Sequence, residues 1–275
     1  MIIALHSFKG GTGKTLLSIN LANMFARTGK KTCLVELDFS APSFFATFKN
    51  TNKNWMNDYL NKACKIETVL TDCSTENMGK GRLFVGLADP STEAIRDMAS
   101  KDRKWEIEAL GRLLSLKDNL TQEMHFDYVF FDTSPGLQYS SINAIIAADV
   151  VIVVSSTDKS DVEGTRRMLQ DLYGLFQKKT ALIANKVPSE YLPSVKVQAL
   201  QANLLGVVPC SCDILKLSVE GTFAPENPDH VLTRKLKEIA ESVEQLCCSA
   251  TCPSILSKQQ ETKTLTISSL NVRRS

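Results

Sequence analysis

The sequence predicts an α/β protein with a doubly wound, mostly parallel sheet flanked by helices. Short apolar runs alternate with amphipathic stretches from residue 2 to residue 247, a pattern typical of strands alternating with helices. Most of the apolar runs are unbroken, as strands covered on both faces require. The first run also leads through a glycine-rich turn directly into a helical pattern. Together these observations favour one large core.

Each expected element follows from local periodicity. The apolar runs that predict strands span 2–7, 32–37, 83–87, 128–132, 150–154, 181–185 and 206–208. The stretches with helical periodicity span 14–27, 91–100, 104–116, 140–147, 161–176, 194–204 and 229–247. The last of these places its apolar residues on one continuous stripe, which indicates a helix packed against the core.

The chain divides into one domain, an insertion and a tail. Residues 1–250 are expected to form the domain. Within it, 44–80 have weak periodicity and are expected to be an insertion of helices and loops. Residues 251–275 are expected to be a flexible tail, because from Pro253 the chain is rich in Ser, Thr, Gln and Lys and carries four cations against one anion.

Composition excludes several classes of protein. A chain of 275 residues and 30.4 kDa buries about 73% of its unfolded surface, so disorder throughout is excluded. The formal net charge is +2, so nucleic acid or anionic membrane would have to be met by a local patch. Apolar runs are far shorter than the ~20 residues that cross a bilayer, and the N-terminus lacks the features of a secretory signal. We therefore expect a cytoplasmic protein whose eight cysteines are reduced thiols.

The first strand runs into the sequence His-Ser-Phe-Lys-Gly-Gly-Thr-Gly-Lys-Thr at residues 6–15 and then into a helix. Glycines at 10, 11 and 13 let consecutive backbone N–H groups point into one concavity at the positive end of the helix dipole, which suits phosphate. Lys14 adds an ammonium for the β- and γ-phosphates, and the Thr15 hydroxyl is placed to ligate Mg²⁺. The residues expected to contact the nucleotide here are Lys9, Gly10, Gly11, Thr12, Gly13, Lys14, Thr15 and Leu16.

This loop departs from the strict phosphate-loop pattern, because Phe8 stands where that pattern has glycine, and it carries a second lysine, Lys9. In this it resembles the deviant Walker A motif of the ParA/MinD family, P-loop ATPases of the SIMIBI class. The resemblance spans about residues 1–245 and implies a P-loop NTPase fold. It also implies that Lys9 reaches across a homodimer to the partner's nucleotide, so that two subunits enclose two ATP molecules. The alternative is a solvated lysine beside a phosphate site.

Two further segments match the family in order and spacing. The second strand ends at Asp38, and the resemblance implies that this carboxylate orients the attacking water; a turn residue is the alternative. The family usually has another Asp two residues earlier, where this chain has Glu36. Residues 126–136 resemble a Walker B and switch II element, in which Asp132 would hold a water on Mg²⁺ and the Gly136 N–H would sense the γ-phosphate.

The base site is expected further along the chain. Asn185 follows an apolar run and resembles the residue that contacts the base in MinD relatives, since an amide can pair with a purine edge through both donor and acceptor. A strand-end cap is the alternative. Pro209 lies where the family's backbone lines the adenine pocket.

The resemblance implies an ATP-dependent dimerisation switch that hydrolyses ATP to ADP and phosphate and thereby positions or partitions a cargo, with an activating or cargo adaptor protein as partner. The sequence does not decide whether DNA or membrane is the surface to which binding is regulated. The cytoplasmic protein would associate peripherally with the nucleoid in the first case and with the membrane in the second. Arg166-Arg167 with Lys178-Lys179, or Arg234-Lys235 with Lys237, are the candidate basic stripes. Solvated helix faces are the alternative.

Two other functions within the superfamily stay open. Cys210, Cys212, Cys247, Cys248 and Cys252 would supply thiolates to a metal-cluster carrier or scaffold, although Cys-x-Cys and adjacent cysteines are not the Cys-x-x-Cys pair of such sites. An ATP-dependent biosynthetic ligase would need a substrate pocket beside the γ-phosphate, and no motif identifies one.

Overall fold

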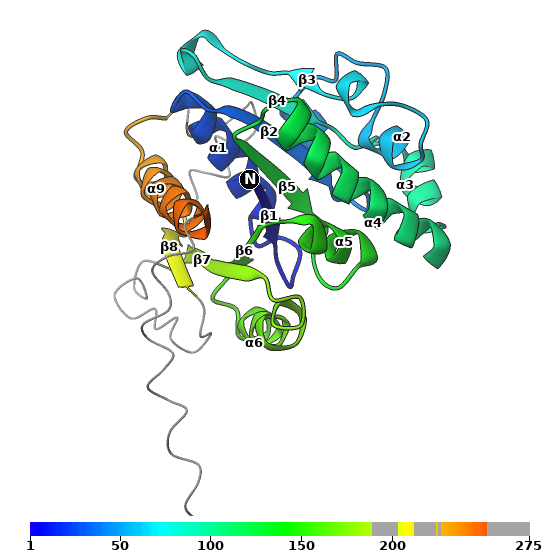
Figure 1. The fold of residues 1–275 in the computed structure, drawn as a ribbon. Coiled ribbons are helices and arrows are strands. Elements are labelled where there is room, and N and C mark those ends of the chain that lie inside the picture. The colour runs from blue at the N-terminus through cyan, green and yellow to red at the C-terminus, as the bar shows by residue number, and fades with distance from the viewer. Residues whose placement is uncertain (189–202, 212–223, 225–226, 252–275) are drawn as a thin grey trace, which may run out of the picture.

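The protein is built around a twisted sheet with helices on both faces (Figure 1). The computed structural model describes residues 1–188, 203–211, 224 and 227–251. The strands are β1 (Ile2–His6), β2 (Lys31–Leu37), β3 (Thr71–Asp72), β4 (Arg82–Gly86), β5 (Tyr128–Thr133), β6 (Val150–Ser155), β7 (Lys179–Val187) and β8 (Asn203–Pro209). Their order across the sheet is β3-β4-β2-β5-β1-β6-β7-β8, and only the β3–β4 pair is antiparallel.

Most of the helices lie between successive strands of the chain, and the last one follows β8. They are α1 (Lys14–Arg27), α2 (Met56–Leu60), α3 (Thr92–Ala99), α4 (Arg103–Asp118), α5 (Tyr139–Ala147), α6 (Lys159–Met168) and α9 (Val231–Thr251). A π-helical segment, η5 (Leu169–Tyr173), continues α6. No helix within the described residues is both long and apolar enough to span a membrane.

The core lies on both faces of the sheet, which is why the strands read as unbroken apolar runs. Successive side chains of a strand point to opposite faces. Ile3 and Leu5 of β1 therefore pack with α1 and α9, whereas Ile2 and Ala4 pack with α4 and α5. Figure 1 shows these helix pairs on opposite sides of the sheet.

The expected fold class is confirmed, with two differences in detail. Residues 44–80 form α2, the 3-10 turns η1 (Phe44–Ala46), η2 (Ile66–Thr68) and η3 (Glu76–Met78), and the edge strand β3. Strand β3 has two residues, too few for a period-two signal. The helix expected at 194–204 falls largely outside the described residues, but its last two positions belong to β8, so the expectation is wrong there.

Sheet order decides where a ligand can bind. Strand β5 lies between β1 and β2, and all three run parallel. Their carboxyl ends, and the loops that follow them, therefore meet at one edge of the sheet, where open α/β sheets bind ligands.

Candidate functional site

The loop after β1 has the backbone conformation of a phosphate-binding turn. Gly11 and Gly13 have φ angles of +76° and +91°, and Gly13 is the N-cap of α1 without a side-chain cap. The positive φ favours glycine at Gly13, and a Cβ there would lie 2.3 Å from the Asn185 amide nitrogen, so that side chain would have to move. The N-terminus of α1 lies at the end of this loop, and the unpaired N–H groups of a helix N-terminus attract anions.

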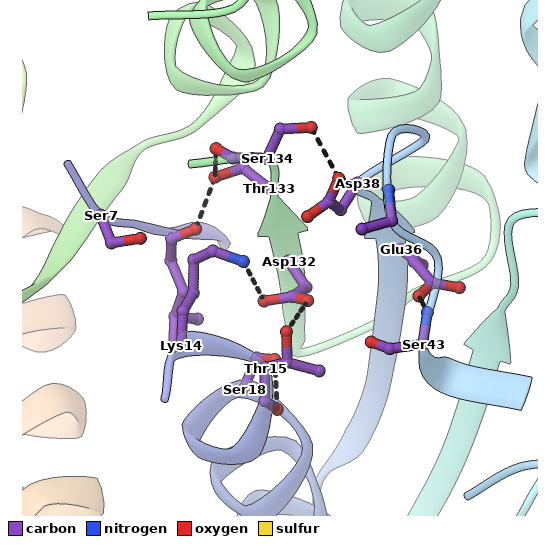
Figure 2. Close-up of polar contacts among 12 residues, drawn as sticks. Ser7, Lys14, Thr15, Ser18, Glu36, Asp38, Ser43, Asp132, Thr133 and Ser134 are labelled. Carbon is purple, nitrogen blue, oxygen red and sulfur yellow. Dashed lines mark hydrogen bonds and ion pairs between the residues drawn. The ribbon is translucent and has the colours of Figure 1, made fainter. Parts of the chain in front are cut away.

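Three side chains meet beneath this loop (Figure 2). Lys14 Nζ lies 3.2 Å from one carboxylate oxygen of Asp132, and the Thr15 hydroxyl donates to the other at 2.8 Å. The Lys14 side chain is 6% exposed and that of Asp132 is 1% exposed, so this is a buried ion pair. Because β5 ends beside β1, the carboxylate reaches the first turn of α1 from the neighbouring strand.

Asp38 lies on the turn after β2 and faces the segment 134–138 after β5, which we call switch II. Its Oδ1 accepts hydrogen bonds from the Ser40 hydroxyl at 2.7 Å and from the backbone of Ser40 and Ala41. The Ser134 hydroxyl donates to the same oxygen at 3.0 Å (Figure 2). The carboxylate is therefore both a turn residue and a link between the loops after β2 and β5.

Glu36 occupies the position where an Asp was expected, and its longer side chain has other partners. It is fully buried and accepts backbone N–H groups of Ser43 at 2.5 Å, Phe44 at 2.9 Å and Ala88 at 3.1 Å. Burial raises the pKa of Glu36 to about 7, against the lowering effect of these three donors. Glu36 thus anchors the segment after Asp38 to the end of β4.

Gly136 has its backbone groups engaged within the chain. Its φ is +73°, and its N–H donates to the Ser7 carbonyl at 2.8 Å. Its carbonyl accepts from the Ser141 hydroxyl at 3.0 Å and lies 2.8 Å from Nε2 of His6. The N–H group expected to sense a γ-phosphate is therefore hydrogen-bonded to the residue that precedes the phosphate loop in this conformation.

The Lys9 side chain contacts residues of its own protomer in this conformation. Its Nζ lies 2.9 Å from Asp158 Oδ1 and also donates to the Ser160 hydroxyl. Asp158 is the N-cap of α6, and its pKa is held well below the usual range, first by the Ser160 hydroxyl and then by Lys9. The Lys9 side chain is still 43% exposed, so the ammonium lies at the surface of the loop.

The expected base-contacting residues lie at the same edge of the sheet. Asn185 is buried on β7, and its amide nitrogen donates to the Thr12 carbonyl at 2.7 Å. Its neighbour Lys186 has a φ of +57° and donates to the Gly11 carbonyl at 2.6 Å. Pro209 ends β8 opposite Val187. In this conformation β7 therefore braces the phosphate loop, a role of Asn185 and Lys186 that their sequence context does not indicate.

The described cysteines do not gather into a ligand set. No group of three or more His, Cys, Asp or Glu in the described part of the chain could hold a metal ion. Cys212, Cys252 and the side chain of Cys248 lie outside that part.

Several cations of the candidate basic stripes have partners within the chain. Arg166 and Arg167 pair with Glu163, and Lys178 donates to two backbone carbonyls at the end of α5. Lys235 pairs with Glu238 on α9.

Comparisons with known proteins identify a family model and several relatives that this chain resembles. Residues 1–187 match a family model described as an AAA domain. The septum site-determining protein MinD of Bacillus subtilis is 26% identical over 255 residues, which cover 88% of this chain and 88% of that protein. The sporulation initiation inhibitor protein Soj of the same species is 27% identical over 170 residues, 61% and 63% of the two chains. The structure of MinD from Pyrococcus horikoshii with Mg-ADP superposes with a TM-score of 0.73 at 20% identity, covering 90% of this chain and 98% of that one.

Proposed function

Because this chain belongs to the ParA/MinD family of P-loop ATPases, we propose that it hydrolyses ATP to ADP and phosphate as a nucleotide-dependent dimerisation switch that positions a cargo. The observation that carries this proposal is the convergence of Lys14, Thr15 and Asp132 under a glycine-rich loop at the N-terminus of α1. Phosphoryl transfer to water needs positioning and charge neutralisation, and these groups are suited to both.

The donor set suits ATP with Mg²⁺. The Thr15 hydroxyl offers an oxygen ligand of the kind that Mg²⁺ prefers, and the buried Asp132 carboxylate that accepts from it would hold a water on the ion. When bound, the ion would neutralise phosphate charge. Lys14 would exchange its partner Asp132 for the β- and γ-phosphates, and the loop residues 9–16 would supply backbone N–H groups. The relative solved with Mg-ADP supports this assignment.

Asp38 would orient the attacking water. Its carboxylate lies on the loop beside Asp132, and Ser134 and the turn at Ser40 hold one oxygen. These hydrogen bonds hold Oδ1 and fix the orientation of the carboxylate. The other oxygen, Oδ2, would then accept a hydrogen bond or a proton from the attacking water. Asn185 and Pro209 would line the base site at the ends of β7 and β8.

Lys9 would act in trans. In the protomer its ammonium is paired with Asp158 at the surface of the loop, where a second protomer can approach. Dimerisation would exchange this contact for the partner's nucleotide, and a cation supplied in trans can be worth ~10³–10⁵ in rate. Hydrolysis would then depend on closure of the dimer.

The test is the oligomeric state of an Asp38→Ala variant. With ATP and Mg²⁺, size-exclusion chromatography is expected to show an accumulated dimer, because nucleotide binding is intact and hydrolysis is lost. Asp97→Ala, which changes an exposed carboxylate on α3, is the matched control and should behave like the wild type. A variant that stays monomeric with ATP would contradict the proposed cycle.

The regulated surface is tested separately. ATPase rates measured alone, with duplex DNA and with anionic vesicles should show stimulation by one surface. Stimulation by neither surface would favour a cargo made of protein alone, reached through an adaptor.

A further inference from the structure

A buried histidine joins switch II to the segment that follows α6. His6 is the last residue of β1 and is fully buried. Its Nε2 lies 2.8 Å from the Gly136 carbonyl oxygen, and its Nδ1 lies 2.5 Å from the hydroxyl of Tyr173, the last residue of η5. The three residues come from β1, switch II and η5, so this contact connects elements far apart in the sequence.

The direction of each hydrogen bond follows from the partners. The Gly136 carbonyl can only accept, so Nε2 carries the imidazole proton and donates it. Nδ1 is then an acceptor, and the Tyr173 hydroxyl donates to it. Burial lowers the pKa of His6 to about 4, which keeps the ring neutral in this arrangement. The chain of donors therefore runs from Tyr173 through His6 to Gly136.

A second contact joins the same stretch of chain to α6. A Cβ on Gly164 would lie 2.1 Å from a ring carbon of Phe8, so the Phe8 ring rests directly on the glycine backbone. Phe8 stands where the strict phosphate-loop motif has glycine. The junction between β1 and the phosphate loop thus contacts α6 through Phe8 and η5 through His6.

These contacts bear on the γ-phosphate response. The Gly136 N–H donates to the Ser7 carbonyl, and the Gly136 carbonyl accepts a hydrogen bond from His6 Nε2. Turning the Gly136 N–H towards a γ-phosphate requires the Ser7 bond to open and moves the adjoining peptide. Leaving the buried His6 N–H without an acceptor costs free energy, so the hydrogen bond to the Gly136 carbonyl opposes the movement of this peptide.

We propose that His6 is a positioning residue for switch II, which stabilises the resting conformation of Gly136 and couples its movement to η5 through Tyr173. The inference rests on the proposed function, since it concerns how the site distinguishes ATP from ADP. It adds a route by which the nucleotide state reaches the α6–η5 side of the molecule.

The test compares the affinities for fluorescent ADP and for a non-hydrolysable ATP analogue, both with Mg²⁺. His6→Leu removes both hydrogen bonds, and the preference for the ATP analogue over ADP is expected to rise about three- to tenfold, the size of one net hydrogen bond. His6→Gln can donate to Gly136 and accept from Tyr173, and should restore the ratio to within about twofold of wild type. Leu182→Val, in the same core cluster as Tyr173, is the control for packing alone and should leave the ratio unchanged.

Hydrogen exchange tests the coupling itself. In the wild type, replacing ADP by the ATP analogue is expected to change exchange in both 134–140 and 169–176. In Tyr173→Phe, which removes one buried oxygen, only 134–140 should respond, and this variant decides the question should His6→Leu not fold.

The outcomes separate the two proposals. A wild type that binds neither nucleotide overturns the proposed function and this inference with it. A wild type that binds both, with an unchanged ratio in His6→Leu or an unresponsive 169–176 segment, overturns only the role of His6.

Discussion

The buried ion pair between Lys14 and Asp132 predicts that substitutions at these two residues have coupled effects on the free energy of unfolding of the protein without nucleotide. Lys14→Met would leave the fully buried Asp132 carboxylate without its cation, and Asp132→Asn would leave the ammonium without its anion. Breaking a buried pair on one side costs about 3–5 kcal/mol, whereas replacing both partners is often close to neutral. The free energy of unfolding of the double variant should therefore exceed the value expected from adding the single effects by about 3 kcal/mol or more.

Urea unfolding of the four proteins without nucleotide measures this coupling. Effects that add within about 0.5 kcal/mol would refute it, since residues that do not interact behave additively. Repeating the series with Mg-ADP provides a second comparison. Ligand at 100 times its Kd should stabilise the wild type by about 2.7 kcal/mol, and this gain should be absent from Lys14→Met, because its phosphate contact is lost.

Three further predictions concern the loop and its supports. Gly164→Ala should lower the free energy of unfolding by about 1–3 kcal/mol, because its Cβ would overlap the Phe8 ring. The control is Gly111→Ala on α4, where the space is open, and it should be neutral or stabilising by about 0.5–1 kcal/mol. Equal effects of the two substitutions would contradict the packing argument. Lys9→Ala should retain ADP affinity in fluorescence titrations but lose the ATP-dependent dimer. A dimer of normal stability would contradict the proposal that Lys9 contacts the nucleotide of the partner protomer. The pKa of His6 in the folded state, about 4, lies below its ordinary value of 6.5, so the unfolded chain takes up the proton first as the pH falls. The free energy of unfolding of the wild type should therefore fall by up to ~3 kcal/mol between pH 6.5 and pH 4. Urea unfolding at several pH values should show that this part of the loss is missing in His6→Gln, and a similar loss in both proteins would rule out His6 as its source.

Much of the fold and the place of the site are readable from the sequence because their signals are local. The phosphate loop, Asp38 and Asp132 each end an apolar run, and parallel strands bring their ends to one edge. Unbroken runs such as residues 150–154 need no partner to be recognised as strands.

The supports of the site could not be predicted, since they depend on contacts across the fold. His6 and Tyr173 are separated by 167 residues, and neither stands in a motif that marks the pair. The engagement of Glu36 by three backbone N–H groups follows from the course of the loop after β2. Residues 203–204 were expected in a helix because the helical periodicity of 194–204 was extended to Leu204, whereas pairing with β7 places both residues in a strand.

Mixing two defective variants tests the central claim most directly. Lys9→Ala keeps its own phosphate site but lacks the lysine that it would lend, and Lys14→Ala lacks its own phosphate ammonium but can still lend Lys9. If Lys9 serves the partner's nucleotide, a mixed dimer contains one complete site, and the ATPase rate of the mixture should rise well above the sum of the two proteins measured alone. A rate equal to that sum would contradict the exchange of lysines between protomers.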